Sequence, residues 1–269
     1  MMKGGVQIEG FLTRLLLPLT FYLVSASIPL VAAAQSATTA DVKPEFEVAT
    51  IKPSDPNVSR GTFFTIKGSH VIAANTDLDD LISLAYGIHT KQIVNGPPWL
   101  ATDRFDIDGV FGTQGRPNRD QMKLLFQKLL ADRFQLAFHH ERKELGVYTL
   151  TVEKSGPKFT RTDRKPTDNT NFSYTNSIVL TVRNASMADF ADGMEGTFMD
   201  RPVVDQTGLK GRYDFILKWT PEGSPAGEDP SAPPGLYTAI KEQLGLRLVP
   251  AKASVHVLVI DRIDKPSPN

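Results

Sequence analysis

The chain has 269 residues, with 30 Lys and Arg balanced by 30 Asp and Glu, and it contains no cysteine. The balance of charge gives no indication of nucleic-acid binding. The lack of thiols excludes disulfides and cysteine metal sites. A chain of this length can still bury a hydrophobic core that needs no covalent cross-links.

Residues 1–34 have the pattern of a signal peptide. Lys3 and Arg14 give a positively charged start, residues 15–31 are mainly apolar, and residues 32–34 are alanines of the kind that a signal peptidase accepts. Retention of the apolar run as a membrane anchor is the alternative, and two prolines in the run disfavour it. We therefore predict an exported protein, periplasmic or secreted, with no membrane attachment after cleavage.

The rest of the chain is predicted to form two similar modules. Residues 35–43 are a polar linker to the first module, residues 44–154; a polar linker at 155–176 then leads to the second, residues 177–264, and residues 265–269 are a tail. Each module is expected to have the order β-α-β-β-α-β-β, an α+β fold with mainly antiparallel sheets.

In the first module, apolar residues recur at helical spacing from Leu78 to Ala85, after a strand that ends at Asn75. The second module repeats that pattern after Asn184. Both modules then have a β-branched pair, a turn and a second helix, followed by two alternating strands. The other predicted elements are first strands at 46–52 and 63–67, second helices at 120–134 and 235–245, and final strands at 135–144, 147–154, 246–252 and 255–263.

Four residues recur at matching places in the two modules. They are the asparagine that ends the strand, a leucine after the turn, and the arginine and aspartate of an Arg-aromatic-Asp triplet. The pairs are Asn75 and Asn184, Leu100 and Leu209, Arg104 and Arg212, and Asp106 and Asp214. We interpret them as architectural, with each arginine pairing with its aspartate to fix the end of a strand.

The sequence offers no familiar catalytic or cofactor motif. It has no nucleophile elbow, phosphate loop, dinucleotide fingerprint or zinc helix motif, and we expect neither a metal nor a cofactor. His139 and His140 are adjacent on a predicted strand, so their side chains point to opposite faces and cannot share one ion. The acidic cluster at 77–80 lies where a helix begins, which favours negative charge.

Two aromatic residues are candidates for ligand binding. Trp99 follows two prolines and offers a platform for a sugar or peptide, and Tyr86 lies near the end of the first predicted helix. The alternative is that Trp99 and Leu100 pack beneath the module.

Several motifs together resemble a known family. FEVATIKPS, GPPWL, DRFDI, LLADRFQL, RPVVDQTGLKGRYDF and VLVIDRIDKPSPN are similar, in this order, to the soil-associated exported proteins that are expanded in acidobacteria. The resemblance covers nearly the whole mature chain. It implies no activity, because none is established for the family. Related domains are fused to membrane zinc peptidases of the β-lactam-sensor type, which implies extracellular sensing.

Three functional hypotheses remain open at this point. The first is a non-catalytic binding or interaction module that acts on an unknown ligand or protein partner outside the cytoplasm. The second is an extracytoplasmic hydrolase whose site is assembled from distant carboxylates or histidines. The third is a structural exported protein.

Overall fold

The computed structural model describes residues 44–58, 65–112, 117–175, 179–221 and 232–266. The predicted signal peptide and the linker that follows it lie outside these ranges, as do the last three residues of the predicted tail. Within the described residues, no helix is long and apolar enough to cross a membrane.

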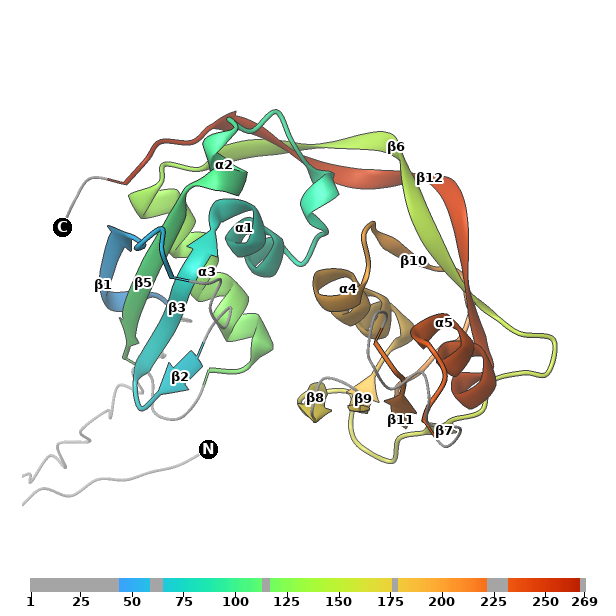
Figure 1. The fold of residues 1–269 in the computed structure, drawn as a ribbon. Helices are drawn as coiled ribbons and strands as arrows, with labels where there is room; N and C mark the ends of the chain where they lie inside the picture. The colour runs from blue at the N-terminus through green and yellow to red at the C-terminus, as the bar shows by residue number, and fades with distance from the viewer. Residues whose placement is uncertain (1–43, 59–64, 113–116, 176–178, 222–231, 267–269) are drawn as a thin grey trace, which may run out of the picture. The chain divides into compact units, whose positions relative to one another are not determined.

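The described strands form three sheets of four strands each, and helices pack against them (Figure 1). The predicted mixture of helices with mainly antiparallel sheets is therefore confirmed. The first sheet is antiparallel and has the order β1-β5-β3-β2. Its strands are β1 (Phe46–Pro53), β2 (Thr65–Lys67), β3 (His70–Asp77) and β5 (Arg104–Phe111).

The second sheet is built on two long antiparallel strands, β6 (Ala137–Val152) and β12 (Leu246–Arg262), which lie side by side in Figure 1. A short parallel strand is added at each edge of the pair, β4 (Ile93–Val94) beside β12 and β10 (Val203–Asp205) beside β6. The third sheet is antiparallel, with the order β7-β11-β9-β8. Its strands are β7 (Thr160–Arg161), β8 (Asn171–Thr175), β9 (Val179–Ala185) and β11 (Tyr213–Lys218).

The three main helices begin at side chains that cap their free backbone amides. Asp77 caps α1 (Leu78–Tyr86), Asn118 caps α3 (Arg119–Arg133) and Ser186 caps α4 (Met187–Phe198). Asn118 and Ser186 each form a capping box with the residue three positions later. The shorter helices are η1 (Thr90–Gln92), α2 (Trp99–Thr102), α5 (Leu236–Ala239) and the π-helical η3 (Ile240–Leu244).

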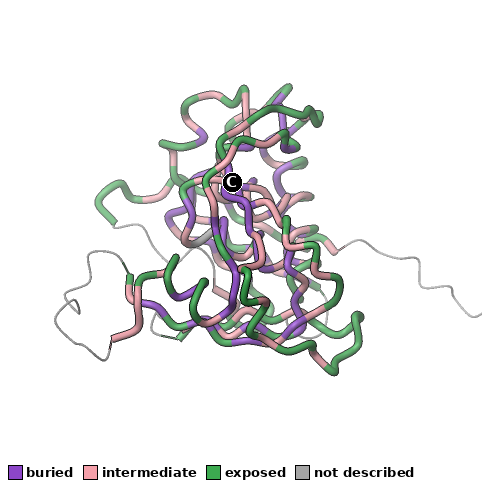
Figure 2. Tube along the Cα trace, turned by 90° about the vertical axis from the view of Figure 1, so that its right-hand side faces the viewer, coloured by how far each residue is buried: buried purple, intermediate pink, exposed green. Residues whose placement is uncertain are grey.

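The buried residues, shown in purple in Figure 2, gather into two hydrophobic cores. The first core lies between the β1-β5-β3-β2 sheet and helices α1 and α3, and the second lies between the β7-β11-β9-β8 sheet and α4. The strand β12 serves both, because Leu258 and Ile260 belong to the first core and Leu246 and Leu248 to the second.

This sharing corrects two expectations from the sequence. The two final strands predicted for each module are one continuous strand, β6 in the first half and β12 in the second. The second half of β6 leaves its own module, since Leu150 is buried in the second core. The sequence suggested a break at Leu145-Gly146 and at Ala253-Ser254, yet Leu145 pairs with Ala253 and both strands continue through these positions.

The segment expected to be a linker, residues 155–176, also contains regular structure. It includes β7 and β8, the two edge strands of the third sheet. Its polar composition follows from that position, because an edge strand can leave most of its side chains in water. Phe172 is the exception, since it is half-buried and packs against the second core.

An asparagine in the left-handed backbone region lies near the end of β3 and another near the end of β9. Asn75 has φ 52° and Asn184 has φ 53°. Asparagine tolerates this region better than most residues because its short amide can bond locally. The Asn184 side chain is fully buried and donates from Nδ2 to the carbonyl oxygens of Lys165 (3.1 Å) and Asp168 (2.7 Å). It thereby anchors the polar segment before β8 to the end of β9.

Two substitutions of Asn184 separate the contribution of its left-handed backbone conformation from that of its side-chain hydrogen bonds. Asn184→Gly keeps the left-handed backbone but loses three side-chain hydrogen bonds, to Lys165, Asp168 and Arg212. We expect it to lower the free energy of unfolding by about 3 kcal/mol. Asn184→Ala adds the backbone strain and is expected to cost about 1 kcal/mol more. Urea unfolding measures both, with the exposed Asn169→Ala as the control, expected within about 0.5 kcal/mol of the parent. Equal losses for the Gly and Ala variants would contradict the role of the backbone conformation.

Candidate functional site

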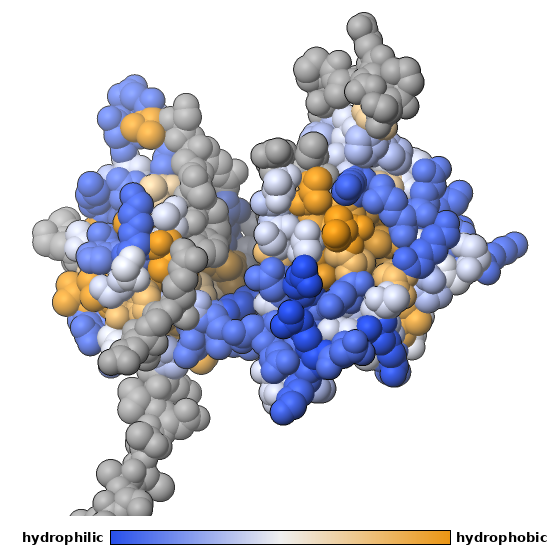
Figure 3. All heavy atoms as spheres, turned by 90° about the horizontal axis from the view of Figure 1, so that it is seen from below, coloured by the Kyte–Doolittle hydropathy of each residue, from blue (hydrophilic) through white to orange (hydrophobic). Residues whose placement is uncertain are grey.

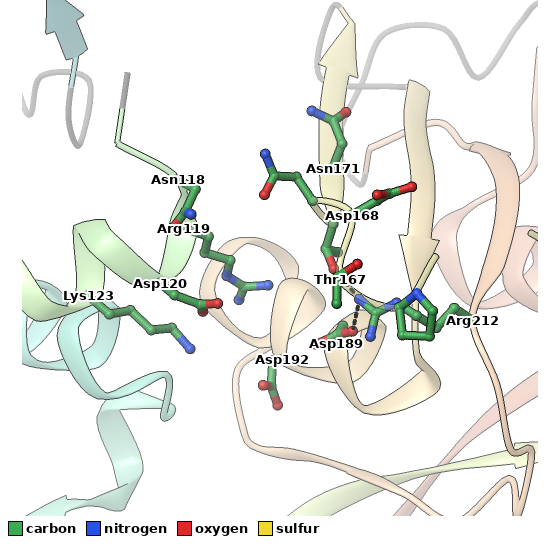
Figure 4. A pocket seen from close by; sticks show the side chains of 13 residues that line it. Asn118, Arg119, Asp120, Lys123, Thr167, Asp168, Asn171, Asp189, Asp192 and Arg212 are labelled. Carbon is green, nitrogen blue, oxygen red and sulfur yellow. Dashed lines mark hydrogen bonds and ion pairs between the residues drawn. The ribbon is translucent and has the colours of Figure 1, made fainter. Parts of the chain in front are cut away.

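A polar pocket with a volume of about 590 Å³ lies between the start of α3, the segment 166–171 and α4 (Figure 4). Most of its lining atoms belong to charged or amide side chains. Its size falls within the usual range for small-molecule sites. The pocket is therefore the candidate site on which the functional argument rests.

One wall carries two basic side chains from the first two turns of α3. The capping box at Asn118 fixes the start of this helix, and Arg119 and Lys123 follow at i, i+4 spacing on one face. The Lys123 ammonium lies against the end of α1, where a Cβ placed on Gly87 would be 2.6 Å from Nζ. Within the described part of the chain, neither Arg119 nor Lys123 forms an ion pair.

The Arg119 guanidinium also contacts an aromatic ring on β8, next to the segment that lines the pocket. Its central carbon is 5.6 Å from the centroid of the Phe172 ring, within range of a cation–π interaction. Phe172 can lie across α4 because position 193 is glycine, where an added Cβ would be 2.9 Å from the ring. A small residue on α4 thus allows the ring that contacts Arg119 to pack beside the pocket, although Phe172 does not line it.

The opposite wall also holds an arginine and an aspartate that are already committed to structure. Arg212 Nη2 is 3.1 Å from Asp189 Oδ2, and Arg212 Nε donates to the Asn184 carbonyl oxygen at 2.8 Å. Arg212 donates in addition to the Thr170 hydroxyl. The Asp189 carboxylate accepts from the Ser186 amide at 2.9 Å as part of the capping box. These groups shape the wall and leave little capacity for a ligand.

Asp192, one turn further along α4, is in a different situation. Among the described residues it has no hydrogen bond or ion pair within bonding distance. The loss of bulk water around it raises its pKa, Arg119 and Lys123 oppose that rise, and the charge of Asp189 adds to it. Figure 4 shows Asp192 and the two basic side chains on different sides of the same hollow. The pocket therefore presents positive charge from α3 and negative charge from α4.

The aromatic residues predicted for ligand binding lie elsewhere. Trp99 is half-buried against the first core, and the Lys265 ammonium is 5.5 Å from its ring centroid. Tyr86 packs edge-on against Phe138, with ring centroids 4.8 Å apart, and burial raises the pKa of its hydroxyl. Neither residue lines the polar pocket.

Of the eight recurring residues, Arg212 lines the pocket and the others serve the two cores or the strand ends. Leu100 is buried in the first core and Leu209 packs partly buried against the second. The backbone of Arg104 pairs with that of Asp77 across β5 and β3.

The expected Arg–Asp pairs within each triplet are not observed among the described residues. Instead, Asp106 Oδ1 accepts from the Asn75 amide at 2.9 Å and Asp214 Oδ1 accepts from the Asn184 amide at 2.7 Å. Burial opposes ionisation of Asp106, but hydrogen bonds from Ser54 and Asn75 hold its pKa below the usual value. The left-handed conformation turns the backbone amides of Asn75 and Asn184 away from the neighbouring strand, and each amide donates to an aspartate instead. The aspartates therefore fix the strand ends through the backbone and not through an arginine.

The histidines lie outside the polar pocket. His139 is exposed on β6, with Nδ1 2.8 Å from Asp261 and Nε2 3.3 Å from Glu141, and these carboxylates raise its pKa. Burial lowers the pKa of His89, whose Nε2 is 3.2 Å from the Met199 carbonyl oxygen. Within the described residues, no group of three or more His, Asp or Glu side chains is arranged to hold a metal ion.

Comparison with known proteins places the chain in a family. Residues 79–263 match the family described as a protein of unknown function (DUF3738). The chain belongs to this family. No curated protein and no solved structure matches the chain. The matched region covers the second core and most of the first, whose residues 51–78 precede it. It includes Arg119, Lys123 and Asp192, so the pocket residues lie inside the matched region.

Few patterns in the sequence point to these pocket residues. Asp189 and Asp192 are spaced i, i+3 at the start of a predicted helix, a pattern that usually means exposed charge near a helix dipole. Arg119 and Lys123 form an ordinary polar face of a helix. The pocket arises because α3 and α4 face each other, and that arrangement depends on long-range pairing of β6 with β12.

A buried carboxyl, Glu195, lies on α4 beyond the pocket. Its side chain is 8% exposed, and it accepts a hydrogen bond from the Val203 amide at 2.5 Å, which ties α4 to β10. Burial raises its pKa to about 8, and the charge of Asp192 contributes. Glu195 is consequently protonated in the folded protein at neutral pH.

This protonation predicts a pH-dependent stability. The unfolded chain releases the Glu195 proton near pH 4.5 and the folded chain near pH 8, so the contribution to stability is present below about pH 4.5 and is lost between those values. We expect Glu195→Gln to match the parent in free energy of unfolding at pH 4 and to exceed it by roughly 4–5 kcal/mol at pH 8.5. Urea unfolding at both pH values tests this, with the exposed Glu144→Gln as the control. A constant difference across pH would contradict the buried, protonated state.

Proposed function

We propose that this protein is an exported, non-catalytic binding protein that acts outside the cytoplasm, in the periplasm or the exterior. Its polar pocket takes a small ligand with an anionic group, held by Arg119 and Lys123. The observation that carries this proposal is the presence of two basic side chains, without ion-pair partners among the described residues, at a pocket of about 590 Å³. The leader pattern of residues 1–34 supports export.

Electrostatics favours an anionic group at the α3 side of the pocket. A guanidinium and an ammonium bind carboxylate or phosphate through charge-assisted hydrogen bonds, which are roughly twice as strong as neutral ones. The helix dipole adds in the same direction, because both residues lie near the amino end of α3. Asp192 faces the same hollow and offers an acceptor for a hydroxyl or amine of the ligand. A ligand with a carboxylate or phosphate at one end and a hydroxyl or amine at the other could bind both Arg119 and Lys123 on α3 and Asp192 on α4.

The same geometry argues against a hydrolase. Two-carboxylate chemistry needs an acid and a base set apart in pKa and both available to the substrate. Asp189, the neighbour of Asp192, is held by Arg212 and by the Ser186 amide. The Asp106 and Asp214 carboxylates accept from backbone amides, and the histidines do not line the pocket. A purely structural protein would have no use for unpaired charges around a hollow.

We also propose that the two halves arose by duplication and that the chain belongs to the soil-associated exported group. The matching left-handed asparagines, each with its amide bonded to an aspartate, support duplication. So do the matching parallel strands β4 and β10 at the two edges of the β6–β12 pair. The motif order supports the soil-associated group, whose relatives fused to membrane peptidases suggest a sensing role through a separate partner.

A thermal-shift screen of the mature protein tests the binding proposal. The panel consists of carboxylates, sugar phosphates, amino acids and cell-wall peptides. A ligand present at about 100 times its Kd adds about 2.7 kcal/mol of stability, which corresponds to a rise in Tm of about 5–10 °C. We expect at least one acidic ligand to bind, and the double variant Arg119→Gln, Lys123→Gln to weaken that binding about tenfold or more.

Lys128→Gln is the matched control. Lys128 lies on the same helix, where it pairs with Asp132 and does not line the pocket, so its loss should leave ligand binding unchanged. The proposal fails if no acidic member of the panel shifts Tm, or if the double variant binds as tightly as the parent.

A further inference from the structure

A second pocket, with a volume of about 440 Å³, lies beside the second core and shares no lining residue with the polar pocket. Four of its eight lining residues are aromatic and two are polar. The aromatic residues are Tyr148, Phe198, Trp219 and Tyr237, and the polar residues are Asp200 and Thr220. This combination of ring surface with a few hydrogen-bonding groups is typical of a specific small-molecule site.

The aromatic residues divide into a fixed wall and an accessible ring. Trp219 is 2% exposed and packs edge-on against Phe198, with ring centroids 4.9 Å apart. Tyr237, on the short helix α5, is 44% exposed. Its hydroxyl donates to the Tyr148 hydroxyl at 3.0 Å, which fixes the position of the ring and leaves the Tyr148 proton available to an acceptor. The pocket therefore presents a positioned aromatic surface to solvent.

The charges at this pocket balance. Arg201 donates to the Asp200 carboxylate from Nη2 at 2.7 Å and from Nε at 3.1 and 3.2 Å, and these bonds lower the pKa of Asp200 to about 2. The same guanidinium lies over the Tyr148 ring, 4.9 Å from its centroid. A cationic ligand would compete with Arg201 for both the carboxylate and the ring face. An anionic ligand would meet the Asp200 carboxylate.

We propose that this aromatic pocket binds a neutral saccharide of one or two pyranose rings. The apolar C–H face of the sugar packs on Tyr237, and its hydroxyls bond to the remaining lone pairs of Asp200, to the Thr220 oxygen and to the Tyr148 hydroxyl. An ionised carboxylate has about four acceptor positions, so the bonds from Arg201 leave room for sugar hydroxyls. The site is separate from the polar pocket, and this inference does not depend on the proposed function.

Tryptophan fluorescence offers a direct test, because the chain has two tryptophans and Trp219 lines the aromatic pocket. In the full mature chain carrying Trp99→Phe, Trp219 is the only tryptophan. We would titrate this protein with neutral mono- and disaccharides of the gluco, galacto, manno and N-acetylglucosamine types up to about 10 mM, enough to approach saturation for a Kd near 1 mM. At least one neutral sugar is expected to give a saturable change.

Three variants make the assignment specific. Tyr237→Ala removes the platform and should weaken binding about tenfold, whereas Tyr237→Phe keeps the ring and should stay within about threefold of the parent. The double variant Arg119→Gln, Lys123→Gln changes the other pocket and should bind the sugar normally. Both Tyr237 variants alter a partly exposed side chain, so their folding is checked by circular dichroism.

The proposal is overturned by any of four results. These are no saturable change with any neutral sugar, undiminished binding to Tyr237→Ala, loss of binding in the Arg119→Gln, Lys123→Gln variant, or tighter binding of choline or glucuronate than of a neutral sugar. If no sugar binds but the thermal-shift screen finds an acidic ligand, the saccharide proposal is wrong and the proposed function still holds. If a sugar binds but no acidic ligand does, the saccharide proposal holds and the proposed function is wrong.

Discussion

The antiparallel pairing of β6 with β12 is the constraint on which the rest of the structure depends. The two strands, 16 and 17 residues long, stay hydrogen-bonded from one core to the other. Each therefore supplies side chains to both cores, and neither core can be completed by one half of the chain alone. The edge strands β4 and β10 add to the same sheet and bring the loops after α1 and α4 to it. Because the contacts that form this sheet join residues about 100 positions apart, they are costly to close and are formed only when both halves are present.

Both candidate sites follow from this arrangement. The polar pocket uses α3 from the first half and α4 from the second, and each helix is fixed at its start by a capping box. Arg212 and Asp189 bind each other and the backbone, so the wall around Asp192 is held in place without involving Asp192 itself. On the face seen in Figure 3, hydrophilic residues surround continuous hydrophobic areas.

Local features of the fold could be predicted from the sequence, and features that depend on distant pairing could not. The starts of α1, α3 and α4 follow from Asp77, Asn118 and Ser186, because a cap acts within four residues. The continuity of β6 was missed because Leu145-Gly146 resembles a turn between two strands, and only the pairing of these residues with Ala253 and Lys252 shows that the chain stays extended there. The roles of Asp106 and Asp214 were misjudged for the same reason, since the amides that they accept from lie about 30 residues earlier. Sequence analysis could not identify the pocket residues because Arg119 and Asp192 are ordinary helix-surface charges until the two helices face each other.

The most direct test of this account asks whether the two cores unfold together. Trp99 packs against the first core and Trp219 is buried in the second, so Trp219→Phe and Trp99→Phe give proteins with one fluorescent probe in each core. In each variant, urea unfolding followed by fluorescence is compared with unfolding of the same protein followed by far-UV circular dichroism. If β6 and β12 join the cores into one cooperative unit, the two transitions coincide in both variants, with midpoints within about 0.3 M. If the fluorescence midpoint differs from the circular-dichroism midpoint in either variant, one core unfolds while the other stays folded. That result would contradict the account of one cooperative unit.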